Sequence, residues 1–142
     1  MIATTLPKPS LLDAAQILVA MFEGKSLTAY KDTGGVWTIG VGHTGPVHGQ
    51  PITAGDAITE QECAQLFQAD LGPVLAQVQS YTTNVQAGGA LVSFGFNCGA
   101  TALAHVISGN AKITQFTHDR SGKIVDGLVK RRAMEQLLID LS

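Results

Sequence analysis

Three side chains in the first third of the chain have the types and spacing for glycoside hydrolysis. Asp32 follows Glu23 after eight intervening residues, and Thr38 follows Asp32 after five. Hydrolysis of a sugar bond uses one carboxylic acid to protonate the leaving oxygen and a second carboxylate on the far side of the bond. The spacing alone is weak, because a solvated helix end, a turn residue and a strand residue would produce the same pattern.

Neighbouring residues give the two acids different expected protonation states. Glu23 follows Met21 and Phe22 at the carboxyl end of an apolar segment, where the helix dipole and the loss of water both favour a protonated carboxyl group. Asp32 adjoins the polar turn at 33–35 and is expected to stay ionised. A neutral acid beside a charged carboxylate is the pair that acid catalysis on a sugar requires.

The segment before Glu23 predicts an amphipathic helix. Ser10 and Asp13 form a capping pair, and apolar residues then recur at helical spacing from Leu11 to Phe22. Gly24 is a natural residue just beyond a helix, because glycine adopts a left-handed backbone without strain. The helix is therefore expected to end at Glu23.

Two short β-favouring runs after this helix predict a hairpin. They are Leu27–Asp32 and Val36–Val41, joined by Thr33-Gly34-Gly35. The hairpin places Asp32 beside its turn and Thr38 on the facing strand. The glycine- and proline-rich stretch from Gly42 to Asp56 predicts a loop or irregular edge.

The remainder of the chain predicts mainly helices. Thr59 and Glu62 form a capping box that begins a helix, and this helix is expected to break or kink before Pro73, with a second helical piece reaching about Gln79. A third predicted helix follows Asn84 and contains three glycines whose small size permits close packing. A fourth begins near Gly127. The segment between Gly99 and Asp126 predicts no clear element, and 108–123 is expected to be a mobile loop or a hairpin.

Length and composition exclude several classes of protein. The 142 residues suit one domain or two small lobes that share a core, and 45% apolar against 14% charged residues supplies material for that core. A net charge of −2 argues against a broad electrostatic contact with nucleic acid or an anionic membrane. Cys63 and Cys98 fit buried free thiols better than a disulfide scaffold or a metal site. The apolar run at 11–22 is too short to span a bilayer and makes a poor secretory signal, so we expect a cytoplasmic protein.

Four sequence blocks carry a family resemblance. In chain order they are Glu23-Gly24 with Ala29–Asp32 and Gly35–Thr44, then Ile58–Leu71, then Ala90–Gly99, then Gly127–Arg132. Together they resemble the phage-type lysozymes, the endolysins of glycoside hydrolase family 24 from lambdoid and T-even phages. The resemblance covers nearly the whole chain.

The resemblance implies both a fold and a reaction. The fold is α+β and lysozyme-like, a single domain at 1–142 with a small β-hairpin lobe at about 25–57 and a larger helical lobe flanking a cleft. The reaction is inverting hydrolysis of the β-1,4 bond between N-acetylmuramic acid and N-acetylglucosamine in peptidoglycan, for host cell lysis, with no cofactor and no metal. Glu23 is then the proton donor, while Asp32 and Thr38 position or activate the attacking water.

Further residues match family positions with supporting roles. Thr44 and Phe96 match positions that line the sugar groove, although Phe96 fits a buried core residue nearly as well. His43 matches a histidine that pairs with an aspartate on the long helix, here Asp70, which predicts a structural ion pair. A solvated basic face is the expected role of Arg131 and Arg132, with an approach to Glu23 across the cleft or a contact with cell-wall carboxylates as alternatives, and no catalytic role is assigned to them. His48, His105 and His118 are expected to face solvent.

Other features of the sequence limit or extend the resemblance. The segment 100–126 is shorter than its family counterpart, which predicts the loss of part of one groove wall or of a packing helix. The resemblance implies a monomer that acts on peptidoglycan glycan strands, with no nucleic acid partner and no stable membrane association. It also implies a host-cytoplasmic location until a holin releases the protein to the periplasm and cell wall.

Two alternatives to a hydrolase remain at this stage. A lytic transglycosylase would cleave the same substrate with the sugar's own 6-hydroxyl in place of water, although Asp32 and Thr38 favour water. A degenerate, non-hydrolytic peptidoglycan-binding module would keep the fold without the chemistry, although the intact Glu23, Asp32 and Thr38 disfavour it.

Overall fold

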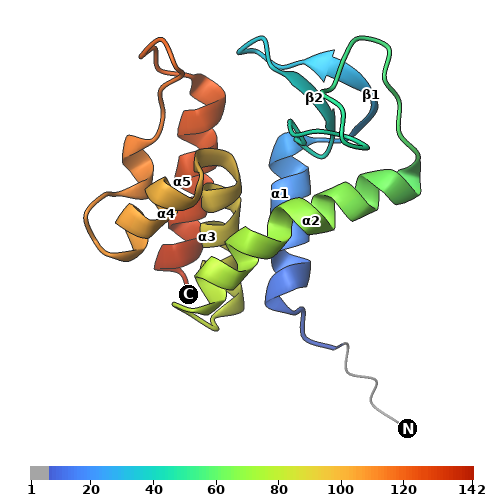
Figure 1. The fold of residues 1–142 in the computed structure, drawn as a ribbon. Helices are drawn as coiled ribbons and strands as arrows, with labels where there is room; N and C mark the ends of the chain where they lie inside the picture. Colours follow the sequence, from blue (N-terminus) through green and yellow to red (C-terminus); the bar gives the residue numbers. More distant parts are fainter. Residues whose placement is uncertain (1–6) are drawn as a thin grey trace, which may run out of the picture.

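A small hairpin and a set of helices form an α+β structure in the computed structural model, which describes residues 7–142. The first six residues of the predicted domain lie outside this range. In Figure 1 the hairpin lies at the end of helix α1, and the long helix α2 leads from the loop after the hairpin toward the remaining helices. In chain order the elements are α1 (Leu11–Glu23), β1 (Ser26–Lys31), β2 (Trp37–Gly40), α2 (Glu60–Gln79), α3 (Val85–Cys98), α4 (Ala100–Ile107), the short 3₁₀ helix η1 (Ile113–Gln115) and α5 (Asp126–Asp140).

Helix α1 confirms the predicted helix and its two ends. The Ser10 hydroxyl accepts a hydrogen bond from the backbone N–H of Asp13, and the Asp13 carboxylate accepts one from the N–H of Ser10. Gly24 follows the last turn with φ of 70°, a left-handed conformation that favours glycine. Because the helix stops there, Glu23 is its last residue.

The strands β1 and β2 form the predicted antiparallel hairpin, slightly shorter than the sequence pattern indicates. Tyr30 lies opposite Thr38, and Lys31 lies opposite Trp37. The turn is closed by Asp32, whose N–H donates to the Val36 carbonyl and whose own carbonyl accepts from the N–H of Gly35. The hairpin therefore holds Asp32 at its tip and places Thr38 across the sheet from Tyr30.

Helix α2 begins as predicted, but it does not break at Pro73. The capping box of Thr59 and Glu62 is present, and one continuous helix runs from Glu60 to Gln79 with Pro73 inside it. Proline removes one backbone donor, which leaves the carbonyl of Ala69 without its helical partner. Ala69 and Pro73 are both exposed, so water can satisfy that carbonyl. The predicted break is wrong, and the alternative of a kink stays a prediction.

Helix α3 is the centre of the core. All eight residues from Gly88 to Gly95 are buried. A Cβ atom placed on Gly88 would lie 2.6 Å from Leu11 of α1, and one on Gly95 would lie 2.6 Å from Leu103 of α4. These glycines permit the close packing of helices that the sequence indicates.

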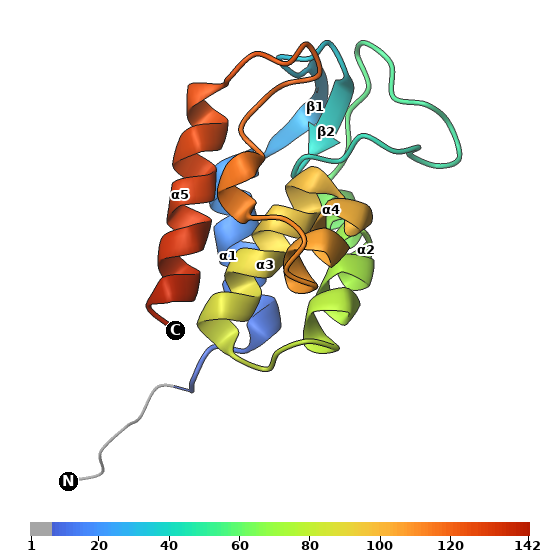
Figure 2. The same ribbon diagram turned by 90° about the vertical axis from the view of Figure 1, so that its left-hand side faces the viewer.

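The segment between α3 and α5 contains helical structure that the sequence pattern did not indicate. It forms helix α4, which packs on α3 through the fully buried Leu103, and then η1 (Figure 2). The following turn is closed by a bridge between His118 and Ile124, with the Asp119 carboxylate accepting from the backbone N–H groups of Ser121 and Lys123. The hairpin alternative therefore describes the tip of this segment, and helix α4 lies where the sequence indicated no clear element.

Candidate active site

Glu23 is held at the junction of three elements. Its side chain is 20% exposed at the end of α1, and Arg131 Nη1 of α5 donates a hydrogen bond to its Oε1 at 2.7 Å. Its other carboxylate oxygen, Oε2, lies against the backbone after β2, where a Cβ atom on Gly42 would approach to 2.8 Å. Gly42 also has φ of 65°. The carboxyl group is therefore fixed on one oxygen and closely faced by backbone on the other.

Asp32 lies exposed at the hairpin tip. Its Oδ1 accepts hydrogen bonds from the backbone N–H groups of Gly34 at 2.9 Å and Val36 at 2.8 Å. These two bonds fix the carboxylate relative to the turn. Because both involve Oδ1, they leave Oδ2 available for another partner.

Tyr30 lies between the two acids in the sequence and pairs with Thr38 across the hairpin. Burial raises the pKa of the Tyr30 hydroxyl, and the charges of Glu23 and Asp32 raise it further. Tyr30 therefore lies within electrostatic reach of both carboxylates. Asp32 thus lies at the hairpin tip, and Glu23 lies beside the backbone that follows β2.

Thr38 is a buried residue of β2. The residue is 3% exposed, and its hydroxyl donates to the backbone carbonyl of Val36 at 3.0 Å. It lies opposite Tyr30 across the sheet. The hydroxyl has lone pairs left to accept a hydrogen bond, but it is already fixed by its own strand.

A hollow of about 700 Å³ lies between the hairpin tip and the C-terminal helices. Asp32 lines one side of it, and the 116–125 turn lines the other. The 116–125 turn therefore supplies one wall of this hollow. The remaining lining residues are Thr33, Gly34, Val36, Asn97, Cys98 and Leu128.

A second hollow, of about 320 Å³, contains the two predicted sugar-binding residues. Thr44 is exposed and Phe96 is half-buried, and both line this hollow together with His43 and Asp70. Phe96 packs edge-on against Phe67 with ring centres 6.0 Å apart. Since Phe96 precedes the lining residues Asn97 and Cys98 directly, the last turn of α3 borders both hollows.

His43 contacts its predicted partner. Its Nδ1 lies 2.7 Å from Asp70 Oδ2, and its Nε2 lies 3.1 Å from the carbonyl oxygen of Pro46. A carbonyl only accepts, so Nε2 carries hydrogen in this arrangement. The histidine therefore joins the loop after β2 to the middle of α2 and positions the floor of the second hollow.

The expected solvated basic face on α5 is wrong. Arg131 is 5% exposed and Arg132 is 1% exposed, and both approach the fully buried Glu135 on the same helix. The sequence analysis missed Glu135. The signal was available, because Glu135 follows the two arginines by four and three residues, which places all three on one helical face.

The other singled-out residues have simpler environments. His48, His105 and His118 are exposed, as predicted, and His48 contacts Glu62 at 2.5 Å. Cys63 is buried and Cys98 is half-buried, and both are free thiols. Within residues 7–142, no cluster of three or more His, Cys, Asp or Glu side chains has an arrangement that could hold a metal ion.

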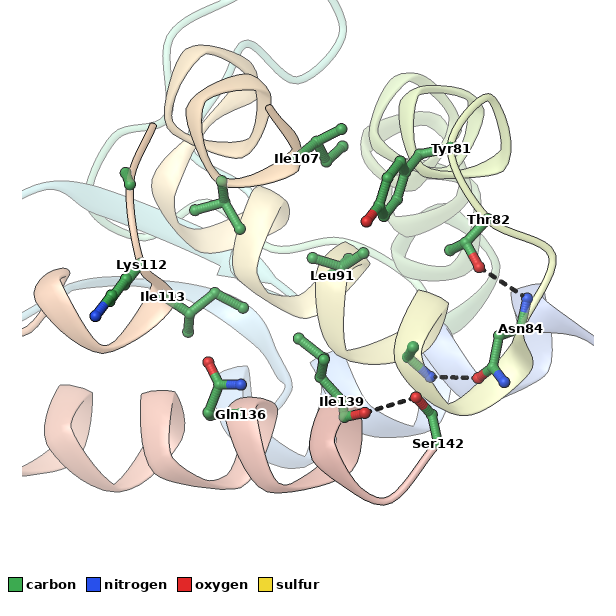
Figure 3. Close-up of a pocket in the computed structure, with 13 residues that line it drawn as sticks. Tyr81, Thr82, Asn84, Leu91, Ile107, Lys112, Ile113, Gln136, Ile139 and Ser142 are labelled. Carbon is green, nitrogen blue, oxygen red and sulfur yellow. Dashed lines mark hydrogen bonds between the residues drawn. The ribbon is translucent and has the colours of Figure 1, made fainter. Parts of the chain in front are cut away.

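A third hollow, of about 560 Å³, lies between the N-terminal half of α3 and the C-terminal end of α5 (Figure 3). Leu91, Ile113 and Ile139 line its apolar floor, while Tyr81 and Gln136 are at its polar edge. It contains none of the residues predicted for catalysis or substrate binding.

Comparison with known proteins identifies the family. A model of the phage lysozyme family matches residues 20–135. The endolysin of Salmonella phage P22 is 36% identical over 128 residues, which cover 82% of this chain and 88% of that protein. The SAR-endolysin of Enterobacteria phage PA-2 is 35% identical over 132 residues, 80% of this chain and 74% of that protein. The solved endolysin from Escherichia coli O157:H7 phage FAHEc1 has a TM-score of 0.74 and 29% identity, over 95% of this chain and 96% of that chain.

The chain therefore belongs to the phage lysozyme family. Its fold and its relatives define it as a glycoside hydrolase of the lysozyme type with an endolysin role. This disfavours both the transglycosylase and the non-hydrolytic alternative. In the part of the chain that the structure describes, no helix is both long enough and apolar enough to cross a membrane.

Proposed function

We propose that this protein hydrolyses the β-1,4 bond between N-acetylmuramic acid and N-acetylglucosamine in bacterial peptidoglycan, with inversion at the anomeric carbon. The proposal is carried by two fixed carboxyl groups: Arg131 holds Glu23 at the end of α1, and the backbone of the turn holds Asp32 at the hairpin tip. One acid is attached to a helix end and the other to a hairpin tip, so they approach the space between them from different elements.

Glu23 acts as the proton donor in this proposal. Arg131 occupies Oε1, so the transferable proton resides on Oε2 and passes from there to the glycosidic oxygen. The bond between this oxygen and the anomeric carbon then breaks, and Glu23 is left as a carboxylate. The fixed position of the carboxyl group supports this role, because proton transfer requires a donor within hydrogen-bond reach.

Asp32 and Thr38 act on the water. Asp32 Oδ2 is available to accept a proton from a water that attacks the opposite face of the sugar, since Oδ1 is held by the turn. Inversion requires space for that water, which corresponds to roughly 6.5–9.5 Å between the two carboxyl groups. The family resemblance supports Thr38 as a hydrogen-bonding residue for the water, acting from within the hairpin.

The two adjoining hollows provide the glycan-binding groove. We assign Thr44 and Phe96 to the second hollow as contacts for the sugar, through the Thr44 hydroxyl and the Phe96 ring. The His43 and Asp70 pair supports that hollow structurally and takes no part in proton transfer. The groove is bounded by the last turn of α3 and by the loop after β2.

Product analysis tests this function directly. Purified peptidoglycan is digested with the full-length protein, and the soluble muropeptides are separated by mass. Hydrolysis predicts reducing N-acetylmuramic acid ends, and NMR of the fresh product predicts the α anomer from a β-linked substrate. Anhydro ends would establish the transglycosylase instead, and β-anomeric reducing ends would contradict inversion.

We further propose how the protein reaches the cell wall. It acts as a single-domain monomer, made in the host cytoplasm and released to the periplasm by a holin, with no stable association with membrane or nucleic acid. Family resemblance supports this route. Expression with and without a holin gene tests it, because lysis that is equally fast without the holin would contradict holin-dependent release.

A further inference from the structure

Glu135 is a fully buried carboxylate that the proposed reaction does not use. It lies on α5 with 0% of its surface exposed and lines neither of the two groove hollows. Removing a carboxylate from water is strongly unfavourable unless cations and hydrogen-bond donors surround it. Its partners therefore indicate what the residue does.

Three side chains surround this carboxylate. The Ser93 hydroxyl donates to Glu135 Oε2 at 2.6 Å, Arg132 Nε lies 2.6 Å from Oε1, and Arg131 Nε lies 3.5 Å from Oε2. Burial raises the pKa of Glu135, while Arg132, Ser93 and Arg131 oppose this rise. The half-buried thiol of Cys98 on α3 contacts Arg132 from the other side.

Arg131 connects this buried cluster to Glu23 at the end of α1. Its Nη1 donates to Glu23 Oε1 at 2.7 Å, and its Nη2 donates to the Ser93 carbonyl at 3.1 Å. The guanidinium also lies over the Phe22 ring, 5.0 Å from its centre. One side of the guanidinium thus holds the proposed acid, and the other is held by the core.

This connection creates an electrostatic conflict. A cation beside a carboxyl group favours its ionised form, whereas a proton donor must be protonated before the reaction. Arg131 and Arg132 together carry two positive charges, and Glu135 offsets one of them. On the hairpin side, the charge of Glu23 raises the pKa of the Tyr30 hydroxyl.

We propose that Glu135 is a positioning residue for Glu23: it clamps Arg131 and offsets the positive charge of the arginine pair, so that Glu23 keeps a transferable proton at the working pH. Glu135 acts through Arg131 and touches no substrate. The proposal rests on the proposed role of Glu23 as the proton donor.

The test is the pH dependence of hydrolysis of purified peptidoglycan by the full-length protein. Glu135→Gln removes the negative charge at nearly constant volume. It is expected to lower kcat with little change in KM, and to move the pH above which activity is lost by about one unit toward acid. Glu135→Asp keeps the charge and is expected to restore the wild-type alkaline limb, that is, the pH range in which activity falls as the pH rises. Arg132→Gln removes a positive charge from the same cluster and is expected to move the limb in the opposite direction.

Circular dichroism at each pH identifies the folded fraction of every variant. A merely structural role would lower activity and thermal stability together and leave the alkaline limb in place. A folded Glu135→Gln protein with the wild-type limb would overturn the proposal. If this variant does not fold, Arg132→Gln decides, and an unmoved limb there overturns it. Retention of activity by Glu23→Gln would instead refute the proposed function itself.

Discussion

The guanidinium of Arg131 lies 2.7 Å from the Glu23 carboxylate, although the two residues are 108 positions apart in the chain. The contact fastens the end of α1 to the first half of α5. It also fixes one oxygen of the proposed acid and leaves the other toward Gly42. The position of the acid therefore depends on the packing of the first and last helices.

Removal of Arg131 is expected to weaken the fold. Arg131→Met leaves Glu23 without its cation and removes one partner of the buried Glu135. Loss of one member of a buried ion pair costs about 3–5 kcal/mol, so we expect a decrease of about 3 kcal/mol in the free energy of unfolding by urea. The exposed neighbour Lys130, changed to Met, is the control and should differ from wild type by less than about 0.5 kcal/mol. Equal stabilities for the two variants would contradict the importance of the Arg131 contacts.

Gly42→Ala is expected to reduce activity by displacing Glu23. The added Cβ would lie 2.8 Å from Glu23 Oε2, so the carboxyl group must move. A displacement of about 1 Å at a catalytic group costs on the order of a hundredfold in rate. Gly49→Ala is a matched control, because Gly49 also has a positive φ, of 75°, but its Cβ would meet nothing within 4 Å. Both variants carry the backbone strain, and only Gly42→Ala should lose most of its activity in a peptidoglycan clearing assay.

The His43 pair is expected to contribute stability. His43→Asn shortens the side chain and removes the contacts with Asp70 and the Pro46 carbonyl. Leaving such partners unsatisfied costs about 1–3 kcal/mol, measured by urea unfolding at neutral pH. The exposed His105, changed to Asn, should change stability by less than about 0.5 kcal/mol. A His43→Asn protein as stable as the His105→Asn protein would refute a structural ion pair.

The capping residue Glu62 is expected to make stability depend on pH. Its hydrogen bond from the Thr59 N–H, followed by its contact with His48, lowers the pKa of the Glu62 carboxyl group below 4.5. A depressed folded pKa contributes stability above the unfolded pKa, and this contribution is lost as the pH falls through the folded pKa. Wild type should therefore exceed Glu62→Gln in thermal stability at neutral pH, and the difference should disappear at about pH 2–3. A difference of the same size at both pH values would contradict this.

Local sequence patterns predicted the elements around the site well. The capping pairs at Ser10 and Thr59 and the glycine after Glu23 act within a few residues, so they are readable without knowledge of the fold. The same holds for the hairpin that carries Asp32. The predicted contact between His43 and Asp70 came from family resemblance, because no local pattern links two residues that lie 27 positions apart.

The incorrect expectations share a physical cause, which is the environment of each residue in the folded protein. Basic residues on a helix usually face water, but Arg131 and Arg132 are buried by partners from α3 and α1 that no local pattern specifies. Pro73 is tolerated because its side of α2 is exposed. Helix α4 depends on one buried leucine, Leu103, against a glycine of α3. In each case the structure depends on whether the residue faces solvent or another element, which the local sequence does not specify.

Activity of Glu23→Gln on purified peptidoglycan is the most direct test of the proposed chemistry. The substitution nearly keeps the volume and retains an oxygen that can face Arg131, and it replaces the acidic group by an amide that has no catalytic proton to donate. We predict a protein with wild-type circular dichroism that releases reducing ends at least about a hundredfold more slowly than wild type. A folded Glu23→Gln protein that retains activity within about threefold of wild type would contradict general acid catalysis by Glu23.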